Sequence, residues 1–441
     1  MRQGKCLVAT LAVCLAARAS AQDVPLSQLL LQFFSASNPI ILDNPFHSAH
    51  FSSQGEAQTT LELLNRNIAA QLASFPVGSS SGGFTFTLDP AVGVLTRNAA
   101  SFGPLFAERA VTAGKGKLTL GFTYQQNIFD KFEGFDLREG DVHLTLYHVD
   151  INNDGSNLQE PFEGDVIDAN LRLRLETNNR VAFASYGLTD RFDIGVAVPF
   201  LSVDIDASID TTIRDVSTIG FPIHRFSQQA TTTLSGMTHT FIETGSAAGL
   251  GDIVVRGKFV AVQKDNLGLG LAADVRLPTG DEEELLGSGA LQAKFFAILS
   301  GNPRNKFNPH LNAGYTYTGE SDLFGELPDE LNYTAGFDAA PTPKLTVFAD
   351  VVGRTLIDAE LLEQEALQLQ YRTLTNPTVR TFDTTQLVSR TGNMTILLGS
   401  VGFKYNPAGR LLFTANALVS LTQNDGLQDK VTPVFSLDYT F

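Results

Sequence analysis

The sequence contains no tryptophan, three methionines and two cysteines, and charged residues make up only 18% of its 441 residues. Both cysteines, Cys6 and Cys14, lie within the first 21 residues. Disulfide bonds and cysteine-based metal sites are therefore excluded from the rest of the chain. No stretch after residue 21 approaches the roughly 18 consecutive apolar residues of a transmembrane helix, which excludes a helical membrane protein.

Positive charge is also scarce, since 31 Lys and Arg residues face 47 Asp and Glu residues, giving a formal net charge of −16. This balance argues against nucleic acid as a partner. The mean hydropathy of +0.03 argues against an acidic disordered chain.

The first 21 residues have the features of a secretory signal peptide. Arg2 and Lys5 precede an apolar run over residues 6–17, and the small residues 19–21 form a cleavage site. We expect cleavage after Ala21. A lipoprotein site at Cys14 stays open as an alternative, although the preceding Val13 has an unfavourable size for one.

Residues 22–115 differ in pattern from the remainder of the chain. Within residues 59–73, apolar side chains at helical spacing predict one amphipathic helix; they are Leu61, Leu64, Ile68 and Leu72. Residues 76–83 read as a linker, and residues 84–96 predict a hairpin that turns at Asp89-Pro90. A separate, partly helical N-terminal segment is therefore expected.

From residue 117 onward the apolar residues recur with a period of two. In residues 267–277 every odd position is apolar, whereas the even positions are small or charged. Such a strand lies between two different environments. Similar alternation recurs later in the chain, in residues 291–299, 311–317, 331–337, 345–351, 411–421 and 431–441.

The lengths and spacing of these strands favour a membrane barrel. Strands of about ten residues match the ~9 to 11 tilted residues that cross a bilayer. Short connections occur at 188–190, 264–266, 301–306, 340–344 and 406–410, and long ones at about 209–248, 279–288, 319–329, 358–390 and 423–429. Short periplasmic turns alternating with long extracellular loops are typical of outer-membrane barrels. A soluble sandwich would also alternate, but mid-strand charges such as Asp274 suit a wet lumen.

The predicted fold is all-β: an antiparallel transmembrane outer-membrane β-barrel of about 12 strands over residues 116–441. It follows a signal peptide (1–21) and a plug-like periplasmic or lumenal segment (22–115). The expected strands are 117–128, 166–187, 191–206, 250–263, 267–278, 289–300, 307–318, 330–340, 345–357, 392–405, 411–422 and 431–441. Residues 141–150 are assigned to an extracellular hairpin. The expected location is the cell outer membrane of a Gram-negative-type envelope, with outer-membrane lipid and lipopolysaccharide as surroundings.

Three segments resemble a known family. They are "YGLTDRFDIGVAVPF" (186–200), "GLGDIVVRGKF" (249–259) and "VRLPTGDEEELLGSG" (275–289). In this order they resemble the outer-membrane barrel family associated with meta-pathway phenol degradation, which is related to long-chain fatty-acid transport channels. The resemblance implies a monomeric barrel for passive uptake of small hydrophobic or aromatic molecules. The alternative is a surface receptor or structural anchor that acts through its long extracellular loops.

Charged residues at inward strand positions are expected to line the lumen. The candidates are Arg172, Arg174, Glu176, Arg256, Lys258, Asp274, Arg276, Lys294, Asp338, Asp350 and Arg354. A turn centred on Asp265 predicts that Arg256 faces Asp274 across a hairpin. Two interpretations stay open: ion pairs that fix the register and neutralise one another, or charges that select anionic solutes.

No motif indicates catalysis, a metal or a cofactor, since HExxH, a serine elbow and paired carboxylates are all missing. The chain is thus not expected to be an enzyme, although a barrel hydrolase with loop-borne residues stays open. The acidic loop at 280–289 is read as solvated, with divalent cation binding as the alternative. Residues 150–155 begin like a calcium loop, but its twelfth position is Pro161, which favours a plain turn.

The last residues, "VTPVFSLDYTF" (431–441), alternate apolar and mostly polar side chains. We expect the apolar ones to face lipid on the strand that closes the barrel onto residues 117–128. Tyr439 and Phe441 would then lie in the periplasmic aromatic girdle. Phe435, Tyr439 and Phe441 resemble the terminal signal that barrel-assembly machinery reads, which makes this machinery an expected partner.

We predict that deletion of Phe441 impairs assembly much more than the function of folded molecules, because the deletion removes the signal and leaves the lumen unchanged. The folded fraction, measured by heat-dependent mobility in gels, should fall, while solute uptake per folded molecule should stay the same. Equal losses in both measurements would contradict this role.

Overall fold

In the computed structural model, the described residues are 24–34, 51, 54–73, 78–79, 83–89, 94–97, 99–148, 158–159, 163–217, 220–226, 235–264, 267–302, 304–372 and 379–441. The predicted signal peptide, residues 150–155 and the centre of the turn at Asp265 lie outside them.

The described residues contain a closed antiparallel barrel of 12 strands, as the alternation predicts. Its strands, in spatial order, are β3 (Leu118–Phe129), β8 (Asp165–Gly187), β9 (Phe192–Asp215), β11 (Val254–Gln263), β12 (Leu267–Arg276), β13 (Gln292–Gly301), β14 (Phe307–Thr318), β17 (Glu330–Thr342), β18 (Leu345–Arg372), β19 (Arg380–Tyr405), β20 (Leu411–Ser420) and β22 (Val431–Thr440). Pairing of β22 with β3 closes the ring, so no strand edge faces lipid.

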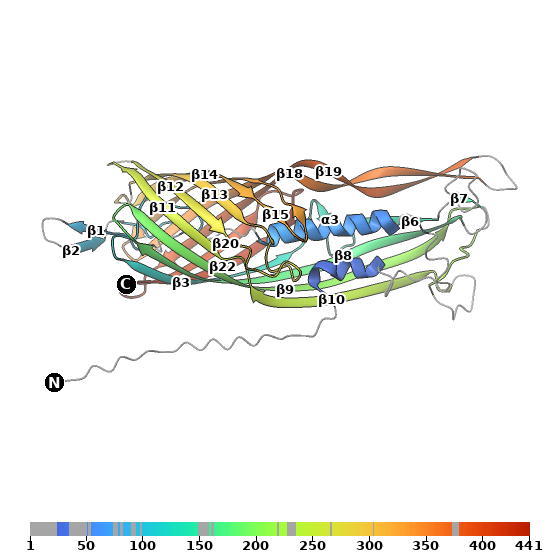
Figure 1. Ribbon diagram of the computed structural model, residues 1–441, viewed down its shortest axis with the longest axis horizontal. Helices are drawn as coiled ribbons and strands as arrows, with labels where there is room; N and C mark the ends of the chain where they lie inside the picture. Colours follow the sequence, from blue (N-terminus) through green and yellow to red (C-terminus); the bar gives the residue numbers. More distant parts are fainter. Residues whose placement is uncertain are drawn as a thin grey trace, which may run out of the picture.

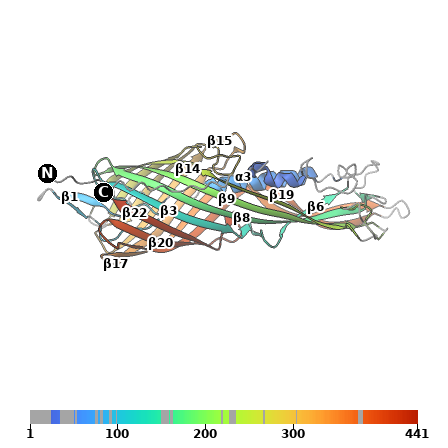
Figure 2. The ribbon, with the colours of Figure 1, turned by 90° about the horizontal axis from the view of Figure 1, so that it is seen from below.

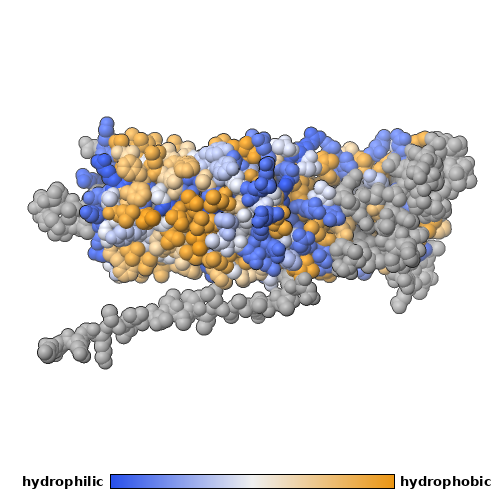
Figure 3. Space-filling view, in the orientation of Figure 1, coloured by the Kyte–Doolittle hydropathy of each residue, from blue (hydrophilic) through white to orange (hydrophobic). Residues whose placement is uncertain are grey.

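An apolar belt surrounds the barrel at the end that carries the C-terminus. On β12 the odd residues point outward, and Leu267, Leu269 and Leu271 are 48%, 39% and 54% exposed. Asp274, at an even position, points inward and is buried. Figure 3 shows apolar residues gathered in a band over this part of the barrel, with hydrophilic residues on both sides of it. The outward residues therefore face the hydrocarbon core of a membrane, because apolar side chains are stable there.

The described helices do not include one that is long and apolar enough to span a membrane.

Four barrel strands continue far beyond the apolar belt, which corrects the predicted loops at 209–248 and 358–390. β9 runs to Asp215 and pairs with β10 (Thr238–Leu250), while β18 and β19 pair as far as Tyr371 and Arg380. β6 (Val142–Tyr147) pairs with the same part of β8 and does not join the closed ring. We call this region the extension; Figures 1 and 2 show it at the end opposite to the C-terminus.

The extension reverses the polarity of the two strand faces, and this overturns the lumen assignment of Arg172, Arg174 and Glu176. Leu171 and Leu173 point inward and are each 1% exposed, whereas the side chains of Arg172 and Arg174 are 51% and 58% exposed. The arginines face water because the outer surface of the extension lies beyond the membrane. The inner surface is apolar because protein covers it.

The outward charges pair with one another across β8 and β9. Arg172 is bonded to Asp210, and Arg174 lies 3.0 Å from Glu176 and 3.6 Å from Asp206. Such exposed pairs contribute at most about 1 kcal/mol each. They mark the outer face of the extension and take no part in the lumen.

Helices fill the interior of the extension. α1 (Leu26–Leu29), η1 (Leu30–Phe34) and α3 (Gln54–Ala73) pack their buried leucines against the inward leucines of β8. The predicted helix is thus present and begins at Gln54. Asn67 donates to the carbonyl of Glu360 on β18 at 2.8 Å, which places α3 above the barrel and not in the periplasm.

The other small elements lie at the two ends of the barrel. β1 (Phe86–Asp89) and β2 (Val94–Arg97) form the predicted hairpin, which projects beyond the end with the C-terminus. At the opposite end, two-residue strands lie near the mouth, namely β4 (Lys131–Phe132), β5 (Phe135–Asp136), β15 (Glu320–Ser321) and β16 (Gly325–Glu326), and β7 (Leu158–Gln159) lies in the extension. β21 (Leu427–Gln428) pairs with β4 there.

The closing strand has the predicted orientation. Phe435, Tyr439 and Phe441 are 45%, 43% and 52% exposed on the lipid side. The Phe441 amide donates to the carbonyl of Leu118 at 2.7 Å, so the last residue completes the seam with β3. The assembly role of these aromatic residues stays a prediction.

The reversal of polarity leads to a prediction about Ile205, which is 1% exposed on the inner face of the extension. Ile205→Asp should lower the free energy of unfolding by about 3 kcal/mol or more, because it buries an unpaired carboxylate. Thr212→Asp, on the outer face of the same strand, should change it by about 0.5 kcal/mol or less. Limited proteolysis of the extension and urea unfolding measure the difference. Equal sensitivity of the two variants would contradict the inward assignment of Ile205.

Candidate functional site

A coil of the N-terminal segment fills part of the barrel. Residues 99–113, here called the lumen segment, are buried at every position except Ala100. Backbone amides along the coil donate to side chains of the wall: Phe102 to Thr346 Oγ1 at 2.8 Å, Ala110 to Ser300 Oγ at 3.1 Å, and Ala113 to Asp193 Oδ2 at 3.0 Å. The wall therefore supplies the partners that a coil without regular secondary structure lacks.

The centre of the lumen segment is held at Glu108. Its amide donates to Asn312 Oδ1 at 2.7 Å, and Asn312 Nδ2 donates back to the Glu108 carbonyl at 2.9 Å. Its carboxylate accepts from Arg256 at 2.7 Å and from Lys258 at 2.9 Å. These groups are buried, and such pairs hold well only when all members are present, because an orphaned buried charge costs several kcal/mol.

The predicted hairpin register is confirmed at Arg256 and Asp274, which lie directly opposite each other on β11 and β12. The guanidinium binds both carboxylate oxygens, each at 2.6 Å. Arg256 thus joins the wall to Glu108 of the lumen segment. The sequence also predicted Lys258 in the lumen, but its partners Glu108 and Asp193 were not expected.

A second buried cluster surrounds His310 of β14. His310 Nε2 lies 2.6 Å from Asp350 and Nδ1 lies 3.7 Å from Asp338. Both carboxylates were predicted as lumen residues, whereas the histidine was not assigned. Its alternation with Leu311 was the available signal, because it places His310 on the inward face.

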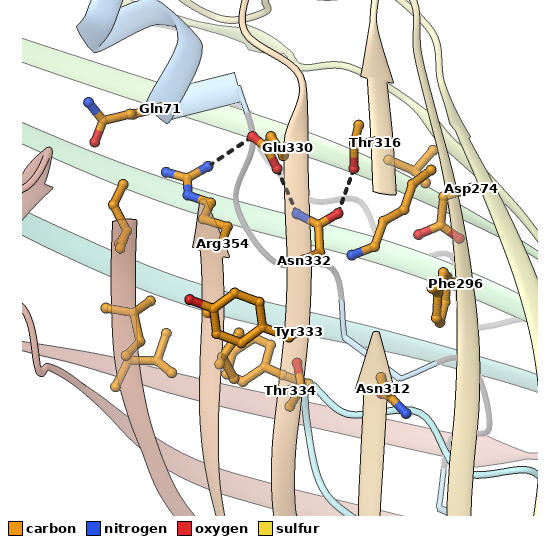
Figure 4. A pocket seen from close by; sticks show the side chains of 18 of the residues that line it. Gln71, Asp274, Phe296, Asn312, Thr316, Glu330, Asn332, Tyr333, Thr334 and Arg354 are labelled. Carbon is orange, nitrogen blue, oxygen red and sulfur yellow. Dashed lines mark hydrogen bonds and ion pairs between the residues drawn. The ribbon is translucent and has the colours of Figure 1, made fainter. Parts of the chain in front are cut away.

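Above the lumen segment lies a cavity of about 170 Å³. Its charged lining includes the predicted residues Arg276, Lys294 and Arg354. Figure 4 shows Glu330 linked to Asn332 and Arg354, and Thr316 bonded to Asn332. The distances are 2.8 Å for Asn332 to Glu330, 3.7 Å for Arg354 to Glu330 and 2.6 Å for Thr316 to Asn332.

The rest of the cavity lining includes polar residues, among them Gln125, Asn127, Thr334 and Thr432, and an apolar surface. Phe106 of the lumen segment contributes, together with Val352, Leu398 and Leu418 from the opposite wall. Gln71 of α3 lies at the upper limit of the cavity and accepts from the Leu427 amide at 2.6 Å. The cavity therefore joins a charged wall to an apolar wall between α3 and the lumen segment. A second cavity of about 90 Å³ lies beyond Phe106, against β8 and β9.

Glu133 lies at the mouth of the barrel, in the turn between β4 and β5. Its carboxylate accepts from the Leu362 amide of β18. Burial, together with the nearby carboxylates of Asp425 and Glu363, raises the pKa of Glu133 to about 7, against the opposing effect of the Leu362 amide. This turn is therefore attached to the extension by a carboxyl group that titrates near neutral pH.

Among the described residues, no group of three or more His, Cys, Asp or Glu side chains is placed to hold a metal ion. The acidic loop at 280–289 is folded against other parts of the chain and is not simply solvated. Leu285 is 1% exposed, the Ser27 amide donates to the Glu283 carbonyl at 2.9 Å, and Asp252 accepts from the amides of Gly280 and Ser288.

A closed barrel with an apolar outer belt and a polar, partly filled lumen defines an outer-membrane β-barrel. Its short-turn end, with both barrel termini, is periplasmic, and the extension is extracellular. The family model described as "Putative MetA-pathway of phenol degradation" matches residues 150–350, which confirms the family resemblance over that range.

Solved structures of outer-membrane proteins match the chain at low identity. The COG4313 outer membrane channel from Pseudomonas putida F1 is 11% identical, with a TM-score of 0.45, and the match covers 75% of this chain and 98% of that one. The Ralstonia pickettii toluene transporter TbuX is 13% identical, with a TM-score of 0.26, and the match covers 74% of this chain and 90% of that one. A Pseudomonas aeruginosa FadL homologue is 11% identical, with a TM-score of 0.32, and the match covers 84% of this chain and 99% of that one. No curated protein has significant sequence similarity to the chain.

The raised pKa of Glu133 predicts a pH-dependent stability. The folded chain holds this proton up to about pH 7, whereas the carboxyl has an ordinary value of 4.5 when exposed. The free energy of unfolding should therefore fall as pH rises from about 4.5 to 7, by on the order of 3 kcal/mol. Urea unfolding at pH 5 and pH 8 should show this fall in the unchanged chain and a smaller one in Glu133→Gln. The same pH dependence in both would contradict the assignment.

Proposed function

We propose that this protein is an outer-membrane channel for passive uptake of small hydrophobic or aromatic molecules. The observation that carries the proposal is the cavity inside the barrel, which joins an apolar wall to a charged wall between α3 and the lumen segment. A purely structural barrel of this size would gain stability from a filled lumen, since voids forfeit packing energy. The proposal involves no enzymatic step.

The lumen segment determines how passage could occur. Its coil is buried and bonded to β9, β11, β13, β14 and β18, so a solute that crosses the lumen must displace it or slip past it. The Glu108 ion pairs hold the centre of the segment, and Phe102, Leu105, Phe106 and Ala110 pack against apolar residues of the wall, so displacement has to break both kinds of contact. The named relatives, a toluene transporter and a FadL homologue, fit this type of solute.

We further propose the organisation of the chain and its assembly. Residues 1–21 would be the signal peptide, and residues 22–115 would supply both the helices of the extension and the lumen segment. The barrel would act as a monomer in lipopolysaccharide-containing membrane after insertion by the barrel-assembly machinery. Among the described residues, the 12 strands of the ring close on themselves, which leaves no unpaired edge in the membrane for a second copy and supports a monomer.

A surface-binding role is the second candidate, because the extension holds the largest hydrophobic core of the molecule. That core joins α1, η1 and α3 to β8, β9 and β10. A barrel that only spans the membrane could transport a solute without such a core. Under this alternative the extension would bind a partner and the lumen would stay closed.

A disulfide between the lumen segment and the wall separates the two candidates. A Cβ placed on Gly270 would lie 3.6 Å from Ala110 Cβ, within the range for a disulfide. With Ala110→Cys and Gly270→Cys, the predicted mature chain contains no other cysteine. Oxidation should reduce uptake of labelled toluene by intact cells at least about tenfold, and reduction should restore it.

The control is Ala110→Cys alone, which cannot form the cross-link and should behave the same with and without reductant. Cells with an intact lipopolysaccharide layer are needed, because apolar solutes cross plain lipid without a channel. Uptake that is unaffected by a fully formed cross-link would exclude passage by displacement of the lumen segment. Uptake no faster with the reduced variant or the unchanged chain than in cells without the protein would favour the surface-binding role.

A further inference from the structure

Lys294 occupies an unusual position in the cavity above the lumen segment. It projects inward from β13, opposite Asp274 of β12. The Asp274 carboxylate is already bound through both oxygens to Arg256. Within the part of the chain that the structure describes, no carboxylate oxygen lies within 4.0 Å of Lys294 Nζ. Its described contact is with the face of Phe296, at 5.2 Å from the ring centroid.

The other acid on the same side of the cavity is also engaged. Glu330 accepts from Asn332 at 2.8 Å and lies 3.7 Å from Arg354. Arg276 adds a further cation to this wall. The lining therefore offers a cationic side chain that the protein itself does not pair, next to two arginines. An anion that enters the cavity would pair with Lys294 there. This pairing is favourable because an unpaired charge at that depth costs free energy.

The opposite wall and the volume limit what the remainder of a ligand can be. Phe106, Leu398 and Leu418 form an apolar surface that suits a ring, while Gln125, Asn127 and Thr432 add polar groups to the same lining. The cavity measures about 170 Å³. An engineered apolar cavity of about 150 Å³ in another protein accommodates benzene. One aromatic ring with a small substituent therefore fits, whereas a long acyl chain does not.

We propose that this cavity binds a single-ring aromatic carboxylate. Its carboxylate lies at Lys294, and its ring lies against Phe106, Leu398 and Leu418. The site accordingly prefers the anion over a neutral molecule of the same shape. This inference rests on the proposed channel function and adds the charge and size of the solute. It also makes Phe106, on the lumen segment, part of the binding site.

Benzoate and benzyl alcohol are the matched probes, because they have similar size and differ in charge. Titration calorimetry on the full-length protein in detergent should show benzoate binding at least about tenfold tighter than benzyl alcohol at pH 7. Lys294→Met should weaken benzoate binding at least about tenfold, since it removes a charge-assisted hydrogen bond. Its effect on benzyl alcohol should stay within about twofold.

Lys344→Met is the control, since Lys344 is exposed in the short turn before β18 and does not line the cavity. It should leave both affinities unchanged. Equal binding of benzoate and benzyl alcohol, or unchanged benzoate binding by Lys294→Met, would overturn the inference. Heat-dependent gel mobility verifies that each variant is folded before the titration.

Uptake separates this inference from the proposed function. If benzoate binds, but reduced cells that carry the cross-link variant take up neither toluene nor benzoate, the binding site is retained and the channel function is overturned. Toluene uptake controlled by the cross-link, without benzoate binding, would retain the channel and overturn the anionic site.

Discussion

The two-residue alternation of the strands, held in one phase from the membrane into the extension, is the constraint on which the rest of the structure depends. Each strand of a closed barrel assigns every residue to the inside or the outside, and a slip of one residue would exchange the two faces. β9 keeps odd residues inside from Asp193 to Ile213. What changes along the strand is the environment on each side.

Within the membrane the outside is hydrocarbon and the inside is partly polar, so Ile194 and Val196 face out and Asp193 faces in. Beyond the membrane the outside is water and the inside is a helical core, so Ile205 and Ile209 face in. The same strand therefore turns its apolar residues outward within the membrane and inward beyond it. The crossover lies between Phe200 and Asp204, where outward residues change from apolar to acidic.

The contacts inside the lumen follow from this alternation and from the charges of the inward residues. Inward positions bring Arg256, Lys258 and Asp193 around one carboxylate, Glu108, which arrives from the N-terminal segment. The same polar interior leaves room above Phe106 for a solute. The lumen segment is held by ion pairs, by single hydrogen bonds and by apolar contacts of Phe102, Leu105 and Phe106 with the wall, whereas the helices of the extension are held chiefly by apolar packing.

The sequence by itself determined the class, the strand number, the closing strand and the pairing of Arg256 with Asp274, because alternation and hairpin register are local properties. It could not determine which face of Arg172, Arg174 and Glu176 meets water, since the same pattern serves a lumen below the membrane surface and an outer face above it. Nor could it place Glu108 beside Lys258, 150 residues away. Only the tertiary structure decided these points, because they depend on where the membrane ends and on what fills the barrel.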